Sequence, residues 1–224
     1  MKKIILTIIA SIALTGASLA GSFGIGVSGS MALVSAEGKE DTGGPQTNQN
    51  NANVSELSQI GSIFAEYQFD NGIAFGIETV PFSADVSDKV HTRSETAVGV
   101  SGADANGAIV RTANAEVKNF NTIYGEYPIG PAYVKLGYSE IDVNTKEKAI
   151  TDSGSYGNVT LSGATIGVGA RGSLGVFGGL FTKTSLEHTK FETLRLKSVG
   201  SSTANSITAN LDVTQFKFAV GKTF

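Results

Sequence analysis

The amino-acid sequence predicts an all-β fold, an antiparallel up-and-down barrel of eight strands. Three observations support this prediction. Apolar side chains alternate with small ones along much of the chain, short turns alternate with long polar connections, and glycine is frequent, with 28 residues among 224. A period of two places every second side chain on the same face of a strand, so each such segment has one apolar face and one face of small residues.

The first segment, residues 1–20, has the pattern of a secretory signal peptide. A basic start and a short apolar run precede Ser18 and Ala20, small residues at the two positions that a signal peptidase recognises. The apolar run is too short to span a membrane as a helix. We therefore expect export and cleavage of this segment, which leaves a single barrel domain of residues 21–224.

The alternation predicts the strands in chain order. In the first strand, residues 22–34, apolar side chains such as Phe23 and Ile25 alternate with serine, glycine and alanine. The second and third strands, residues 59–69 and 73–80, alternate in the same way. An Asp-Asn-Gly turn joins them, in which glycine provides the left-handed conformation of a three-residue hairpin loop.

The other five strands complete the predicted barrel. Residues 117–127 and 132–143, joined by the short sequence Pro-Ile-Gly-Pro, form the fourth and fifth, although alternation in the fourth is less clean. Residues 158–170 and 174–187, joined by an Arg-Gly-Ser turn, form the sixth and seventh. The last strand, residues 207–224, ends in alternating phenylalanines.

Long polar connections join the strands that short turns do not. They are predicted at residues 35–58, 81–116, 144–157 and 188–206. The first has low sequence complexity, which is typical of a mobile loop. The strict alternation of short and long connections places the short turns on one rim and the long loops on the other. The facing of Phe177 and Phe181 stays ambiguous, because they fall opposite Leu174 and Leu180 in the seventh strand.

Two glycine patterns, at residues 24–29 and 167–172, match the G-x-G-x-x-G sequence of dinucleotide-binding sites. That pattern binds a pyrophosphate only where a buried strand leads into a helix. Both copies lie within segments of period two, with no helix following. We therefore interpret the glycines as part of a strand face and predict no cofactor.

The composition of the small-residue face indicates which face points inward. It consists mostly of serine, glycine, alanine and threonine, whereas an exterior in water normally carries many charged residues. The interior of a narrow barrel also needs small side chains. We therefore predict that the apolar face contacts lipid, which makes the fold an all-β, eight-stranded antiparallel up-and-down transmembrane β-barrel.

On these features the chain resembles the eight-stranded outer-membrane barrels of Gram-negative bacteria, the opacity-protein and outer-membrane-protein-A-like superfamily. The resemblance covers residues 21–224 and rests on the architecture, on the sequence YVKLGYS after a short turn, and on the aromatic C-terminus. In that family the C-terminal residues form the signal read by the barrel-assembly machinery. The corresponding residues are Phe216, Phe218, Val220 and Phe224. Lys222 departs from the pattern, which usually has an apolar residue there. The resemblance implies outer-membrane lipid and the assembly machinery as partners.

Charged residues on the inward face predict an ion network across the lumen. Its members are Glu66, Glu78, Lys135 and Lys217, with Lys183 nearer the outer mouth and Arg171 near the periplasmic one. Buried charges are costly unless they pair, so we expect contacts between carboxylates and ammonium groups. The network either fills the barrel as a plug or opens as a gate, and the narrow interior of eight strands favours the plug.

No enzymatic site is predicted. His188, with Ser185 and Glu187 nearby, is the best candidate for a lipid-modifying site, but alternation places Ser185 and Glu187 on the opposite face from His188. Two histidines and no cysteine cannot form a transition-metal site. The net charge of −3 argues against nucleic acid as a partner.

These observations predict an integral outer-membrane barrel with a structural or surface-interaction role. Its long extracellular loops would contact ligands outside the cell, because loops on a rigid scaffold commonly carry recognition. The alternative is a narrow gated channel, or a passage for small molecules across the outer membrane.

Overall fold

The computed structural model describes seven stretches of the chain. They are residues 21–41, 49–85, 91–96, 108–147, 155–175, 178–199 and 205–224. The predicted signal peptide, with its cleavage residues Ser18 and Ala20, lies outside the described residues, as does Phe177. The division into a signal peptide and a barrel domain stays a prediction.

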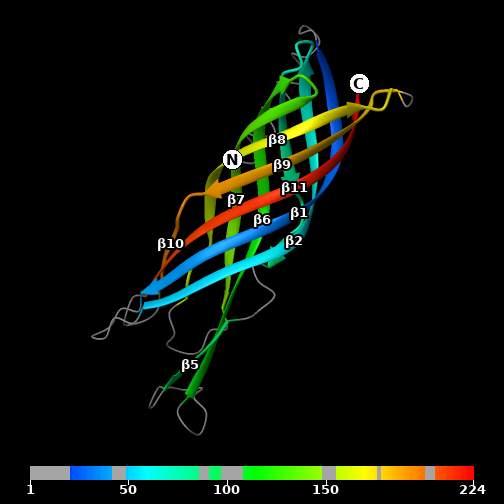
Figure 1. Cartoon of the computed structure of the whole chain (residues 1–224). Coiled ribbons are helices and arrows are strands. Elements are labelled where there is room, and N and C mark those ends of the chain that lie inside the picture. Colours follow the sequence, from blue (N-terminus) through cyan, green and yellow to red (C-terminus); the bar gives the residue numbers. More distant parts are fainter. Residues whose placement is uncertain are drawn as a thin grey trace.

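Eight antiparallel strands form a closed ring (Figure 1). In ring order they are β1 (Gly21–Asp41), β2 (Gln49–Phe69), β3 (Ala74–Val80), β6 (Ala108–Ile129), β7 (Ala132–Glu147), β8 (Val159–Ser173), β9 (Leu180–Phe191) and β11 (Ser206–Thr223). Pairing between β1 and β11 closes the barrel. Two short strands, β4 (Ala84–Asp85) and β5 (His91–Thr96), pair with β6, and β10 (Leu194–Lys197) pairs with β11. The predicted fold class is confirmed.

The short connections share one rim with the C-terminus, at the top of Figure 1. The predicted turn between β2 and β3 is confirmed: Phe69 N–H donates to the Ile73 carbonyl at 2.8 Å, and Gly72 has a φ of 86°. The predicted Arg-Gly-Ser turn is wrong. Those residues continue β8, and the Leu174 N–H donates to the Leu180 carbonyl at 2.8 Å, so the hairpin closes further along the chain.

At the other rim the strands extend much further than predicted. The expected loop over residues 35–58 is wrong for the described residues of that range, because β1 and β2 stay paired in register as far as Asp41 and Gln49. In the same way, β6 begins at Ala108, within a segment predicted as a loop. Polar side chains do not prevent strand pairing where the strand faces water, because the hydrogen bonds between strands are formed by the backbone and not by the side chains.

A β-bulge in β6 explains the less clean alternation of that strand. The pairing with β7 shifts register between Lys118 and Asn121, and Asn119 adopts a φ of 54°, a left-handed conformation that asparagine tolerates. On one side of the bulge Glu126 is buried inside the barrel, and on the other side Val117 packs against the interior. The extra residue therefore changes which positions face inward.

A band of apolar side chains covers the outside of the barrel next to the short-turn rim. Exposed members from the ring strands include Ile25, Val27, Met31, Leu33, Ile63, Phe75, Ile123, Leu136, Ile166, Val168, Leu186, Phe216 and Phe218. Val27 is 60% exposed. Such an exterior is typical of a barrel that contacts lipid, which confirms the predicted orientation of the apolar face. In the described part of the chain, no helix has the length and apolar character needed to cross a membrane.

Beyond this band the two faces exchange their character. The interior there holds an apolar cluster: Ala32, Phe120, Ile141, Val143, Leu161, Phe191, Leu194, Leu211 and Val213. Except at Ala32, whose neighbours belong to the apolar band, the outward neighbours of its members are polar; Val213, for example, lies between Asp212 and Thr214. The same order holds in β7, β8 and β9. Near the short turns the barrel is apolar outside and polar inside, whereas near the long connections it is polar outside and apolar inside. The sequence predicted small residues and ions in the lumen, so this apolar cluster was not foreseen.

Candidate functional site

Eight ionisable side chains point into the half of the barrel that carries the apolar band. They are Glu66 from β2, Glu78 from β3, Glu126 from β6, Lys135 from β7, Arg171 from β8, Lys183 and Glu187 from β9, and Lys217 from β11. Four carboxylates therefore face four cations, and the formal charge of the set is zero. Glu66 is only 2% exposed. Seven of the eight strands contribute, so the contacts span the lumen.

Four of these side chains form a closed square at mid-height. Lys135 Nζ lies 3.1 Å from a Glu78 oxygen and 2.9 Å from Glu187. Lys217 Nζ lies 2.7 Å from Glu78 and 3.0 Å from Glu187. Each charge thus contacts two of opposite sign, an arrangement that offsets the cost of removing all four from water. We call this set the middle square.

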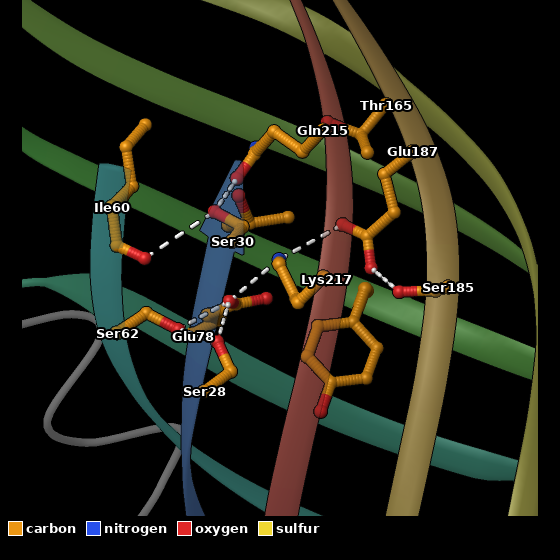
Figure 2. A network of polar contacts seen from close by, with 12 residues as sticks. Ser28, Ser30, Ile60, Ser62, Glu78, Thr165, Ser185, Glu187, Gln215 and Lys217 are labelled. Carbon is orange, nitrogen blue, oxygen red and sulfur yellow. Dashed lines mark hydrogen bonds and ion pairs between the residues drawn. The ribbon is translucent and has the colours of Figure 1, made fainter. Parts of the chain in front are cut away.

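Serine hydroxyls complete the coordination of the two carboxylates in the middle square (Figure 2). Ser62 donates to Glu78 at 2.5 Å, and Ser28 lies 2.5 Å from the Ser62 hydroxyl. Ser185 donates to Glu187 at 2.8 Å. The small inward residues that appeared in the sequence as a plain strand face therefore act as hydrogen-bond donors to buried charges.

The other four ionisable groups lie nearer the short-turn rim, and we call them the rim cluster. Glu66 contacts Lys183 Nζ at 2.9 Å and also pairs with Arg171, while Lys183 pairs in addition with Glu126. The Tyr124 hydroxyl donates to Glu66 at 3.0 Å. The predicted position of Lys183 nearer the outer mouth is wrong, because β9 begins at the short-turn rim only three residues before it.

A row of hydroxyl groups separates the middle square from the apolar cluster. Thr122, Ser139, Thr165 and Thr189 follow one another across β6, β7, β8 and β9. Successive oxygen atoms lie 2.8, 2.7 and 2.7 Å apart. From the short turns towards the long connections, the interior therefore passes from ions to hydroxyls to hydrocarbon.

One glycine in each G-x-G-x-x-G pattern, Gly26 in the first and Gly169 in the second, makes room for a lumen side chain. A Cβ atom at Gly26 would lie 2.4 Å from the Phe64 ring, and one at Gly169 would lie 2.5 Å from the Tyr133 ring. No side chain larger than hydrogen fits at such positions without displacing an aromatic ring.

Phe181, whose facing the sequence left open, points into the lumen. It is 3% exposed and packs edge-on against Phe64, with ring centroids 6.2 Å apart. The Arg171 guanidinium stacks on the Phe181 ring, 3.8 Å from the ring centroid. The aromatic ring therefore supports a cation of the rim cluster.

Six of the eight members of the network were predicted from the sequence, and Glu126 and Glu187 were missed. Glu187 was considered only beside His188, although the inward alternation of Lys183 and Ser185 continues to it. Glu126 was hidden by the bulge in β6, which disturbs the alternation of that strand.

The candidate enzymatic group is not assembled. Ser185 and Glu187 lie inside the barrel, whereas His188 lies outside, with Nδ1 2.9 Å from the Thr214 hydroxyl. Among the described residues, no three side chains of the metal-ligating types gather at one point.

Beyond the apolar band, Glu192 links β8 to the end of β9. The backbone N–H and the hydroxyl of Ser162 donate to its carboxylate at 3.1 and 2.9 Å, and these bonds lower the pKa of Glu192 below its usual value. The predicted assembly-signal residues Phe216, Phe218, Val220 and Phe224 point outward on the band. Their role as a signal stays a prediction.

The closed ring, the apolar exterior and the filled lumen define a class: small transmembrane β-barrels of the outer-membrane type. No family model matches the sequence, and no curated protein matches it.

Solved structures of outer-membrane proteins resemble the chain in architecture. The outer membrane protein OprG from Pseudomonas aeruginosa has 9% sequence identity and a TM-score of 0.48, over 91% of this chain and 96% of that one. The attachment invasion locus protein Ail of Yersinia pestis, in complex with the heparin analogue sucrose octasulfate, has 10% identity and a TM-score of 0.40, over 89% and 99%. Neisserial surface protein A has 11% identity and a TM-score of 0.38, over 90% and 97%. Because each score is below 0.5, the class rests on the chain's own strand ring and exterior.

Proposed function

We propose that the protein is an integral barrel of the bacterial outer membrane with a structural and surface-interaction role, exerted through the end that carries the long connections. The exchange of polar and apolar faces along the barrel carries this proposal. It divides the protein into a half suited to lipid and a half suited to water. The water-facing half has its own apolar interior, so it forms a rigid platform above the bilayer.

The platform is held together by contacts that cross its circumference. β1 and β2 remain paired as far as Asp41 and Gln49. The Tyr156 hydroxyl donates to Glu40 at 3.0 Å, and Ser155 forms a backbone bridge with Val199. A segment after β7 is thereby tied both to β1 and to the segment after β10. Connections on such a rigid scaffold are where recognition commonly occurs.

The filled lumen supports a plug rather than a gate. An eight-stranded barrel is just wide enough for side chains to fill, and here paired ions, hydroxyls and hydrocarbon occupy successive levels. To open the middle square, both lysines must leave both carboxylates. Each uncompensated buried charge costs about 3–5 kcal/mol.

Two measurements test the proposal. Because the chain has no cysteine, single cysteines can be labelled on intact cells with a membrane-impermeant maleimide. We expect Lys39→Cys, near the end of β1, to be labelled, and Asn71→Cys, in the β2–β3 turn, to be labelled only after the outer membrane is opened. The opposite pattern would refute the orientation.

Planar-bilayer recording tests the plug. We expect no discrete openings from the purified barrel. Discrete openings whose conductance changes in Glu78→Ala or Lys135→Ala would refute the plug and support the narrow gated channel instead.

A further inference from the structure

A cavity of about 400 Å³ lies at the short-turn rim, beneath the rim cluster. Its outer wall is formed by the hairpin connections, including Gly72, Pro128 and Gly179. Its inner wall carries two charged groups of opposite sign, Glu126 from β6 and Arg171 from β8. The cavity lies at the opposite end of the barrel from the platform, so it is separate from the proposed surface role.

Glu126 lines this cavity with an incompletely bonded carboxylate. The side chain is 5% exposed, and its Oε1 pairs with Lys183. Within the described part of the chain, no donor contacts its second oxygen. A carboxylate offers about four acceptor positions. A buried acceptor without a partner is unfavourable, so a hydrogen bond from a donor that reaches it is stabilising. The cavity is the space from which such a donor can come.

Arg171 offers the complementary charge. Its guanidinium is fixed by the stack on Phe181 and by one pairing, through Nη1 to Glu66. A guanidinium carries five N–H donors, so among the described contacts most of them remain for another acceptor. The side chain is 19% exposed and lines the same cavity. Arginine in this position suits a carboxylate, which it can bind through two parallel bonds.

The combination selects a ligand that carries both charges. A simple anion would meet Glu126 and Glu66, and a simple cation would meet Arg171 and Lys183. The rings of Tyr133 and Phe181 line the same cavity and provide apolar surface for an organic body. Its volume falls in the range of small-molecule sites.

From this geometry we infer that the cavity binds a small zwitterion, an amino acid or short peptide. The ammonium group of the ligand donates to Glu126, and its carboxylate accepts from Arg171. No covalent step is involved. This inference does not depend on the surface role, and its failure would leave that role unaffected.

Titration calorimetry of the purified barrel in detergent tests the inference. The probes are alanyl-leucine and two capped forms of it, N-acetyl-alanyl-leucine and alanyl-leucine amide, which lack the ammonium and the carboxylate respectively. We expect the free dipeptide to bind at least about tenfold more tightly than either capped form. Equal affinities for the three probes, or no heat from the free dipeptide up to about 10 mM, would overturn the inference.

Matched variants identify the two contacts. Glu126→Gln should weaken binding of the free dipeptide about tenfold while changing that of the N-acetylated form little. Arg171→Gln should likewise weaken binding of the free dipeptide about tenfold while changing that of the amidated form little. Lys222→Gln, outside the barrel at the same rim, is the control and should change nothing. Mobility on unheated gels shows which variants have folded. A folded Arg171→Lys variant should bind less tightly than the wild type, because lysine lacks the planar fork. Variants that alter all three probes alike would overturn the assignment.

Discussion

Replacing Glu78 with glutamine tests the middle square directly. The carboxylate is 3.1 Å from Lys135 Nζ and 2.7 Å from Lys217 Nζ, and both cations are almost fully buried. The neutral amide keeps the size of the side chain but leaves two buried cations to share Glu187. Breaking one side of a buried ion pair costs about 3–5 kcal/mol, so we expect the free energy of unfolding to fall by that amount.

A second substitution distinguishes charge balance from packing. Combining Glu78→Gln with Lys217→Gln leaves Lys135 paired with Glu187 at 2.9 Å and restores neutrality. We therefore expect the double variant to be more stable than the sum of the two single effects, by at least about 1 kcal/mol. Lys190→Gln, on the outside of β9 beyond the apolar band, should change stability by no more than about 0.5 kcal/mol.

Urea unfolding of the barrel refolded into lipid vesicles provides the measurement. Folded and unfolded forms are separated on unheated gels, and tyrosine circular dichroism follows the same transition. If the free energy of unfolding of the single variants stayed within about 1 kcal/mol of the wild-type value, the four charges of the middle square would not depend on one another as described. Strictly additive effects in the double variant would show that packing, rather than charge balance, sets the cost.

The same unfolding assay checks three further predictions. Val213→Asp places an unpaired charge in the apolar cluster and should destabilise by at least about 2 kcal/mol, whereas Asp212→Val, on the water-facing side of the same strand, should change stability by about 0.5 kcal/mol or less. Gly26→Ala forces a methyl group against a lumen phenylalanine and should cost about 1–3 kcal/mol, while Gly29→Ala, which meets no atom within 4 Å, should be tolerated. Leu136→Arg on the lipid face should cost about 2–4 kcal/mol in vesicles; an unchanged midpoint would contradict lipid contact there.

The period-two pattern was sufficient to predict the ring of strands and its lipid face, because alternation follows directly from backbone geometry. It could not reveal where a strand ends once both faces become polar, so the pairing of β1 and β2 as far as Asp41 and Gln49 was missed. It also could not reveal the height of each residue along the barrel axis. A residue's partner inside a barrel depends on the stagger between strands, which no single segment records.

For the candidate site, too, the facing of residues could be predicted from the sequence but their partners could not. Alternation alone placed Glu66, Glu78 and Lys135 on the inward face. Their pairings depend on register across three or more strands, so the split into a middle square and a rim cluster could not be foreseen. Glu126 escaped notice because one inserted residue in β6 changes which positions face inward, and no local signal marks that residue.

The change of polarity along the barrel also determines how deep the protein sits. On β1 the outward apolar side chains run from Phe23 to Leu33, ten steps of about 3.3 Å, or roughly 25 Å once strand tilt is included. If the barrel sank by two residues, Asp212, which pairs with Ser35, would reach the hydrocarbon boundary. If it rose by two residues, apolar side chains of the band would enter water. The polarity pattern of the chain therefore sets its vertical position, and the height of the apolar band suits a thin bilayer.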